Sequence, residues 1–137
     1  MSEPIALAER YAAVWNEPDA ARRRTLIEEL WTEHAAHVLQ PPQDIKDSAA
    51  AVGMVPILEI QGHDALYLRV TRSHEEFIAP GEFTFRARAN AERLKDLVKF
   101  GWEMVRREDG EVAGVGLEVV FLADDGRIRE DYQFIEP

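Results

Sequence analysis

The sequence predicts an α+β fold in which about three helices pack on a curved, mainly antiparallel sheet and enclose a pocket, in the shape of a cone. Three observations predict it. Apolar residues follow helical spacing early in the chain, alternate with polar residues late in the chain, and the late segments are separated by Asp-Gly turns. Helices that come first and strands that come last are not the alternating order of a parallel α/β sheet.

Two short amphipathic helices are expected at the start. Residues 5–15 carry apolar side chains at i, i+3, i+4 and i+7, namely Ala8, Tyr11, Ala12 and Trp15. Pro18 suits a first helical position and predicts a second helix over 18–32. The buried stripe of this second helix is Leu26, Ile27, Leu30 and Trp31. Its arginines, 22–24, are expected on a solvated face that pairs with Glu28 and Glu29.

The middle of the chain has a less regular pattern. Residues 33–40 are interpreted as a short strand that a Pro-Pro pair ends. Residues 44–52 fit either a loop or a short helix, and residues 58–60 fit either a brief strand or an irregular lid. Helical spacing returns over residues 62–78 and stops at a Pro-Gly pair.

The last part of the chain predicts an antiparallel meander. Its strands are expected over residues 83–89, 97–107, 112–123 and 127–136. The segment 115–122 is apolar on both faces and therefore needs cover on both sides of the sheet. The helices can cover one face, and a second subunit is the simplest cover for the other. We therefore expect a homodimer formed through the outer face of the sheet.

Composition restricts the classes of function. The chain has 137 residues, a formal net charge of −10 and no cysteine. Such an acidic chain is a poor partner for nucleic acid or an anionic membrane. Disulfides, thiol nucleophiles and cysteine-ligated metals are excluded. The first ten residues lack the apolar run of a signal peptide, and no apolar stretch is long enough to span a membrane, so a soluble cytoplasmic protein is expected.

Five short motifs, taken together in this order, resemble a known family. They are Tyr11-Ala-Ala-Val-Trp15-Asn16, Leu30-Trp31-Thr-Glu, Phe100-Gly-Trp102, Gly116-Leu-Glu118-Val-Val and Asp125-Gly126-Arg127-Ile128. The chain resembles the SnoaL-like family of the nuclear transport factor 2-like superfamily over nearly its whole length, as a single SnoaL-like domain of residues 1–137. The resemblance implies an α+β cone with a deep pocket, often dimeric. It implies no single reaction, because this fold supports cyclases, isomerases, dehydratases, epoxide hydrolases and non-enzymes.

The resemblance also points to individual positions. The polyketide cyclases that name the family carry a catalytic Asp in the strand before the Asp-Gly turn, and the matching residue here is Glu118, eight residues before Gly126. Where those enzymes have a His-Trp pair in the last strand, this chain has Asp131 and Tyr132. The strand over 97–107 contains no histidine, so the second catalytic group of the cyclases has no counterpart.

Glu118 is the foremost candidate for chemistry. A carboxyl group among apolar neighbours has a raised pKa and can act as a general base near neutral pH. Tyr132 or His37 could then serve as the acid or hydrogen-bond donor. The alternative for Glu118 is an ion pair with Arg86 or Arg88. Cofactor-free isomerisation, dehydration or cyclisation of a small apolar or aromatic molecule is the predicted function, and the alternative is a non-catalytic ligand-binding or dimeric accessory protein.

The remaining pocket candidates are aromatic and polar. They are Trp15, Trp31, His34, Phe100, Trp102, Glu103 and Asp131. If two of the three acids among Glu103, Glu118 and Asp131 share a face, one can act as an acid and the other as a base. His34 and His37 lack the third ligand of a recognisable metal motif, so neither a metal nor another cofactor is expected.

Overall fold

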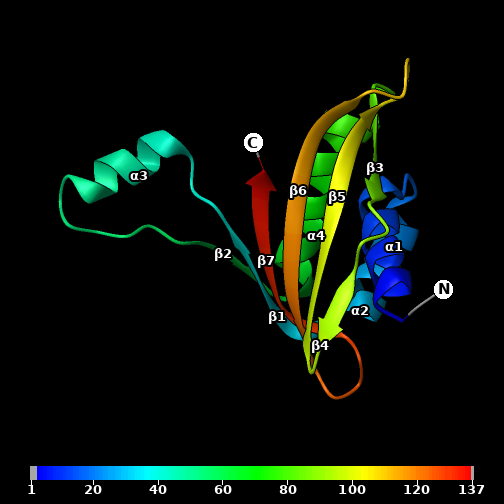
Figure 1. Ribbon diagram of the computed structural model, residues 1–137, viewed down its shortest axis with the longest axis horizontal. Coiled ribbons are helices and arrows are strands. Elements are labelled where there is room, and N and C mark those ends of the chain that lie inside the picture. The colour runs from blue at the N-terminus through cyan, green and yellow to red at the C-terminus, as the bar shows by residue number, and fades with distance from the viewer. Residues whose placement is uncertain (1–2, 137) are drawn as a thin grey trace.

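The computed structural model describes residues 3–136 and consists of helices packed on one face of a strongly curved, seven-stranded sheet (Figure 1). The elements are α1 (Glu3–Asn16), α2 (Ala20–Leu30), β1 (Trp31–Leu39), α3 (Gln43–Ala50), β2 (Leu58–Gln61), α4 (Gly62–Ser73), the π-helical turn η1 (His74–Ile78), β3 (Phe83–Ala87), β4 (Glu92–Leu94), β5 (Leu97–Arg106), β6 (Val112–Leu122) and β7 (Ile128–Glu136). The strand order is β2-β1-β7-β6-β5-β3, and β4 pairs with β5. Only the β1–β7 pair is parallel among these strands. The predicted α+β class is confirmed, with four α-helices in place of about three.

The boundary between α2 and β1 differs from the prediction. Asp19 caps α2, because its carboxylate accepts hydrogen bonds from the backbone N–H groups of Ala21 and Arg22. Pro18 therefore precedes the helix and is not its first residue. Trp31 has extended backbone angles and begins β1, although it is fully buried as expected. The prediction that placed it in the helix was wrong because burial alone does not distinguish a last helical turn from a first strand residue.

Arg23 also departs from the expected solvated face. Its side chain is buried and donates to the backbone carbonyl of Glu17 at 2.9 Å and to the hydroxyl of Thr71 at 3.1 Å. It therefore joins the turn before α2 to α4. Arg24 behaves as predicted, and its guanidinium lies 3.4 Å from the carboxylate of Glu28.

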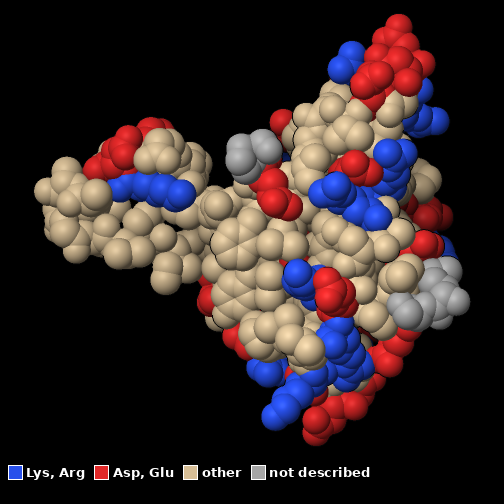
Figure 2. Space-filling model, in the orientation of Figure 1, with Lys and Arg blue, Asp and Glu red and all other residues tan. Residues whose placement is uncertain are grey.

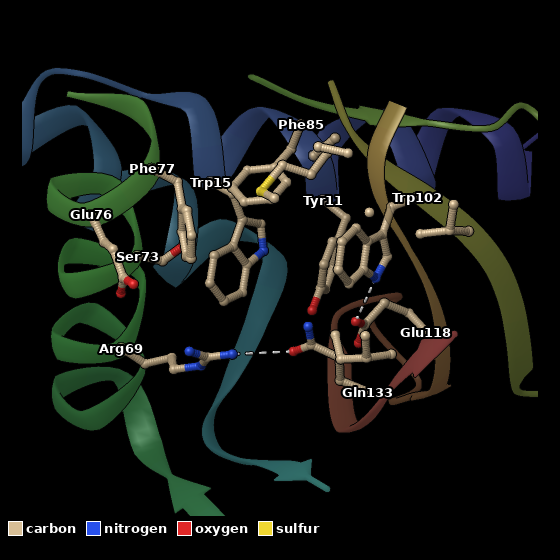
Figure 3. Close-up of a pocket in the computed structure, with 16 residues that line it drawn as sticks. Tyr11, Trp15, Arg69, Ser73, Glu76, Phe77, Phe85, Trp102, Glu118 and Gln133 are labelled. Atoms are coloured by element: carbon tan, nitrogen blue, oxygen red, sulfur yellow. Dashed lines mark hydrogen bonds between the residues drawn. The ribbon is translucent and has the colours of Figure 1, made fainter. Parts of the chain in front are cut away.

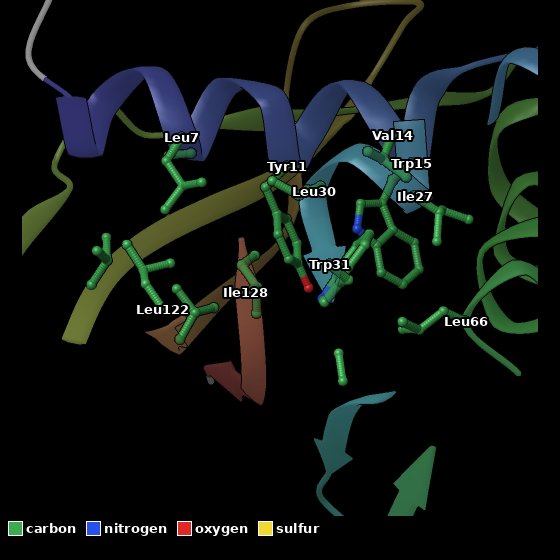
Figure 4. Close-up of a cluster of buried hydrophobic side chains, with 14 of the residues drawn as sticks. Leu7, Tyr11, Val14, Trp15, Ile27, Leu30, Trp31, Leu66, Leu122 and Ile128 are labelled. Carbon is green, nitrogen blue, oxygen red and sulfur yellow. The ribbon is translucent and has the colours of Figure 1, made fainter. Parts of the chain in front are cut away.

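The core lies between α1, α2, α4 and the inner face of the sheet (Figure 4). Along β6 the residues that face the helices are buried and the alternate residues are partly exposed on the outer face. The inward set is Gly116, Glu118, Val120 and Leu122. Two of the largest buried side chains, Trp31 and Phe100, contact Tyr11 edge to face. Glu118 is therefore a carboxyl group among the buried, mostly apolar residues of the inner face of the sheet.

Between β1 and β2 the chain leaves the body as an arm, which we define as residues 40–57 (Figure 1). Leu39 and Leu58 are partners in the β1–β2 ladder, so the arm starts and ends at neighbouring positions. It contains α3, the short helix that the sequence left open against a loop, and none of the residues of α3 is buried. Separately, within residues 3–136 we find no helix with the length and apolar character needed to cross a membrane.

Candidate functional site

A cavity of about 510 Å³ lies between the inner face of β5, β6 and β7 and the helical elements α1, α4 and η1 (Figure 3). Most of its wall is apolar and aromatic. The lining residues are Tyr11, Ala12, Trp15, Arg69, Ser73, Glu76, Phe77, Phe85, Trp102, Met104, Ala113, Gly114, Val115, Glu118, Gln133 and Ile135. A volume of this size suits a small molecule, and the flat rings on several sides favour a planar apolar one.

Glu118 contributes the deepest polar group of the wall. It is fully buried, and its Oε1 accepts a hydrogen bond of 3.0 Å from the indole Nε1 of Trp102 (Figure 3). Trp102 can reach it because Gly116 is its direct partner across the β5–β6 ladder. A Cβ on Gly116 would come within 2.1 Å of the indole ring. The glycine thus lets the ring cross β6 and direct its N–H toward the carboxyl group.

Behind Glu118 lies a second buried carboxyl group, Asp131. Its Oδ2 accepts a hydrogen bond of 2.8 Å from the hydroxyl of Tyr11 and one of 3.3 Å from Nε1 of Trp31. The Nδ1 atom of His37 lies 3.2 Å from the same oxygen. His37 and Asp131 are direct partners in the parallel β1–β7 ladder, which explains their proximity although they are distant in sequence. Both side chains are completely buried.

The environment separates the protonation states of the two carboxyl groups. Burial, followed by the charge of Asp131, raises the pKa of Glu118 well above its ordinary value of 4.5. Burial opposes ionisation of Asp131 too, but His37 and the neighbouring Glu118 and Tyr11 side chains outweigh it and hold the pKa of Asp131 below 3.8. The two environments therefore separate the pair: Asp131 ionises first, and Glu118 keeps its proton to higher pH.

The tyrosine beside the pair is also kept protonated. Burial, followed by the charges of Asp131 and Glu118, raises the pKa of Tyr11 well above 10.0. Its hydroxyl therefore remains a hydrogen-bond donor throughout the range in which proteins are usually studied. Since Tyr11 also lines the cavity, it connects the buried Asp131 to the space that a ligand would occupy.

Three side chains of this site could hold a metal ion. One ligand atom each from His37, Glu118 and Asp131 lies within 4.8 Å of the other two. Oε2 of Glu118, Oδ1 of Asp131 and Nε2 of His37 are buried and have no hydrogen-bond partner among the described residues. One imidazole and two carboxylates form a donor set that divalent transition metals accept. The same unpartnered atoms are equally suited to exchanging a proton.

The structure brings some of the sequence candidates together. Glu118, His37 and Asp131 form one buried cluster, and Trp15 and Trp102 lie in the cavity wall. The sequence pattern had not singled out Gly116, Arg69 or Gln133 for this site. The helical stripe predicts Tyr11 as a core residue, and its hydroxyl in that otherwise apolar stripe is the signal that could identify it.

Other candidates lie elsewhere. Tyr132 is on the outer face, where its hydroxyl donates to Glu130 at 3.1 Å, and so it does not reach Glu118. Glu103 is outside the cavity and pairs with Arg86 at 2.9 Å. His34 is exposed near a polar surface hollow.

Trp31 and Phe100 are buried in the core and are not part of the cavity wall. Trp31 nevertheless contributes to the cluster through its hydrogen bond to Asp131. Phe100 supports the position of Tyr11 by an edge-to-face contact. Both residues therefore act on the site from behind, and neither is positioned to contact a ligand in the cavity.

Comparison with solved structures places this architecture among known proteins. A proposed isomerase of the SnoaL-like family from Agrobacterium tumefaciens str. C58 is 23% identical, with 100% of both chains covered and a TM-score of 0.78. An NTF2-like protein of unknown function from Exiguobacterium sp. 255-15 is 18% identical, with 95% of this chain and 98% of that chain covered and a TM-score of 0.65. A SnoaL-like protein of unknown function from Burkholderia thailandensis E264 is 14% identical, with 100% of this chain and 99% of that chain covered and a TM-score of 0.61.

No family model and no curated protein matches the chain. These structural alignments cover the whole of this chain. At these sequence identities they establish the fold and leave the chemistry to the residues of the cavity. The chain has the α+β cone fold of the SnoaL-like and nuclear transport factor 2-like proteins.

Proposed function

We propose that this chain binds a small, largely apolar molecule in its cavity and transfers protons on it without a cofactor, as an isomerase, dehydratase or cyclase. The observation that carries the proposal is the position of Glu118, a completely buried carboxyl group at the wall of an apolar cavity. Arg86 does not neutralise Glu118, because it pairs with Glu103 on the outer face. Perturbed carboxyl groups in clefts are frequent sites of acid–base chemistry.

A proton shuttle on Glu118 accounts for the arrangement. The carboxyl group donates a proton from Oε2 to a carbonyl oxygen of the substrate, while Trp102 holds Oε1. The resulting carboxylate removes a proton from the adjacent carbon, which leaves the enol and a protonated Glu118. Glu118 then gives this proton to a different carbon and takes back the proton from the enol oxygen, which restores both the carbonyl group and the carboxylic acid and completes an isomerisation. In its resting state Glu118 is thus an acid, and it acts as a base only after donating.

Asp131 supports this cycle from behind. Its negative charge disfavours a second carboxylate beside it and so favours the return of a proton to Glu118. His37, Tyr11 and Trp31 keep that charge in place by the contacts described above. In this proposal Asp131 and His37 are positioning residues, because neither lines the cavity.

The outer face of the sheet supports the homodimer as part of the same proposal. Phe134 is exposed, and Val119, Phe121 and Tyr132 are only half-buried on that face. Apolar and aromatic side chains that a single subunit leaves uncovered are typical of protein–protein interfaces.

Deuterium exchange tests the chemistry with a probe that requires no knowledge of the natural substrate. The probe is 2-tetralone, a flat bicyclic ketone with acidic carbon-bound protons, followed by NMR in D₂O. We expect exchange faster than in buffer and a loss of about 100-fold or more in Glu118→Gln, in line with the usual contribution of an acid–base group. Glu103→Gln, on the outer face, is the matched control and should retain the rate.

The same experiment distinguishes an enzyme from the alternative, a non-catalytic ligand-binding protein. Saturable binding of 2-tetralone without faster exchange would assign the chain to the non-catalytic ligand-binding proteins. Equal rates for wild type and Glu118→Gln would exclude Glu118 as the shuttle.

A further inference from the structure

Arg69 is the one cationic residue among those that line the cavity. It projects from α4, and its guanidinium carbon lies 5.4 Å from the ring centroid of Trp15. A guanidinium N–H donates a long hydrogen bond of 3.4 Å to Oε1 of Gln133 on β7 (Figure 3). The charged group thus extends between the helical wall and the sheet wall.

The charge of Arg69 lacks an acidic partner among residues 3–136. Other arginines of the chain, such as Arg24 and Arg127, have carboxylates at 2.8 Å. The Nε atom of Arg69 is also buried without a hydrogen-bond partner. A cation held against apolar walls with unused donors is costly unless something pairs with it.

We propose that the ligand of this cavity is a flat apolar molecule with an anionic oxygen group, such as a carboxylate, that binds Arg69. A guanidinium presents two parallel N–H groups that match the two oxygens of such an anion. Trp15, Phe77 and Phe85 then enclose the apolar part, and the reacting end faces Glu118. This inference rests on the proposed function of the cavity, and it adds the chemical class of the substrate.

Two fluorescent probes of nearly the same shape test the anion site. One is 8-anilinonaphthalene-1-sulfonate, and the other is N-phenyl-1-naphthylamine, which lacks the sulfonate. We expect the two probes to compete for wild type, and Arg69→Gln to weaken the sulfonate at least 10-fold while the neutral probe retains its affinity. The affinity of Arg69→Lys for the sulfonate probe should lie between those of wild type and Arg69→Gln. Arg72→Gln, an exposed arginine of the same helix, should change neither affinity.

Each other outcome has a defined meaning. Equal loss of both probes in Arg69→Gln would overturn the anion site and indicate a structural role. Undiminished sulfonate binding would overturn it as well. If wild type bound neither probe, the cavity would not be a ligand site and the proposed function would fail first.

A second inference concerns the arm, residues 40–57, and rests on its surface. Its large apolar side chains are exposed, with fractions from 42% for Ile45 to 86% for Val55, and include Val52, Met54 and Ile57. The space-filling view shows the arm as a projection whose surface is mostly uncharged apart from α3 (Figure 2). Exposed groups of this number amount to roughly 600 Å², near the upper limit for the largest apolar patch of a typical monomer.

The composition of the arm indicates its partner. Its charged residues are Asp44, Lys46 and Asp47, and a single lysine is too little to attract an anionic membrane. The body has an uncovered apolar residue of its own, Phe134, near the end of β7. In one copy the arm leads away from the body (Figure 1). We infer that the arm packs against a second copy of this chain, so that a two-fold dimer buries both surfaces reciprocally. Each copy would contribute the roughly 600 Å² of its own arm, which is most of the roughly 800 Å² per partner that a stable interface needs.

The ladder partners Leu39 and Leu58 allow a clean test. Replacing residues 41–57 by Asn-Gly closes the hairpin with a three-residue loop. It keeps Gln40, whose side chain accepts a hydrogen bond from the backbone of Ile135. We expect wild type to be a dimer by light scattering, and the shortened chain to dimerise much more weakly. Its circular dichroism should lose only the signal of α3, and its binding of N-phenyl-1-naphthylamine should be unchanged.

Point variants provide a matched pair for the arm. Val55→Asp should produce monomers at concentrations where Leu94→Asp, at a residue 77% exposed on β4, remains dimeric. A shortened chain that dimerises as tightly as wild type would overturn the inference. A wild type that is monomeric at high micromolar concentration would overturn it too and would indicate a different partner for the arm.

Discussion

Trp102 lies across Gly116, and this contact determines where the buried hydrogen bond to Glu118 can form. The indole occupies the space that any side chain at position 116 would need, with ring atoms at 2.1 and 2.2 Å from the site of a Cβ. A glycine of β6 is therefore as important to the cavity as the residues that face it.

Gly116→Ala should displace the indole and weaken both the fold and the site. We expect a loss of about 1–3 kcal/mol in the free energy of unfolding, the usual cost of overpacking a core, together with weaker binding of N-phenyl-1-naphthylamine. Urea unfolding and fluorescence titration measure the two effects. Gly114→Ala is the control for the stability measurement, since its Cβ would meet Met104 at an ordinary 3.8 Å. Equal behaviour of the two variants would show that the indole moves without cost.

Glu118→Gln should make the protein more stable in alkaline solution. The pKa of Glu118 is raised in the folded state, so the folded protein holds its proton more tightly than the unfolded chain. That contribution to stability is fully present below the unfolded pKa and is lost as the pH rises from about 4.5 through the folded value. A glutamine has no proton to lose, and it can keep the bond from Trp102.

Urea unfolding at pH 5 and pH 9 measures this difference. The free energy of unfolding of Glu118→Gln should exceed that of wild type by more than about 1 kcal/mol at pH 9, since one pKa unit is worth about 1.4 kcal/mol. At pH 5 the difference should be much smaller. If the two proteins had the same pH dependence, Glu118 would not carry the proton.

Tyr11→Phe should destabilise the buried carboxylate of Asp131. The variant removes the donor of the 2.8 Å hydrogen bond, and leaving a buried charged group with fewer donors costs about 1–3 kcal/mol. The pKa of Asp131 should rise, because the Tyr11 hydroxyl is one of the groups that lower it. Chemical denaturation and carboxyl NMR titration report the two changes. Tyr67→Phe, at a partly buried tyrosine of α4, is the reference.

Metal removal distinguishes proton exchange from metal binding at the His37, Glu118 and Asp131 cluster. Dialysis against EDTA should leave the unfolding midpoint and the exchange of 2-tetralone unchanged. Added zinc or manganese should not stabilise wild type more than His37→Gln. A midpoint that rises with metal only when His37 is present would assign the cluster to a metal ion, because binding to the folded state adds directly to stability.

Periodicity predicts α1, α4 and the late strands, but it extends α2 too far, leaves α3 open against a loop and does not give the faces of the last strand. Simple alternation places Ile128, Glu130 and Tyr132 on one face. In the structure Ile128 and Asp131, three residues apart, are both completely buried, because the β6–β7 register shifts between Phe121 and Leu122. The bulge turns Asp131 inward and Tyr132 outward.

The pairing of strands that are distant in the sequence is the second feature that the sequence alone does not predict. His37 was a candidate for its chemistry alone, and nothing local indicates that β1 runs parallel to β7 and sets it beside Asp131. Glu118 could be identified because a lone acid in a run of apolar residues is conspicuous. Arg69 could not, because an arginine in an amphipathic helix usually faces solvent, and only the tertiary structure turns this one toward the cavity.

The neighbouring positions of Leu39 and Leu58 have a consequence for how this chain can diverge. The polypeptide leaves the sheet and returns to it at neighbouring positions, so residues 41–57 can lengthen, shrink or change in composition while Gln40 keeps its contact with Ile135 of the cavity wall. In the proposed dimer and ligand site, mutations in that segment would alter which surfaces meet, whereas mutations in β5, β6 and β7 would alter which molecule is bound. Selection can therefore act on association and on ligand choice through separate stretches of the gene.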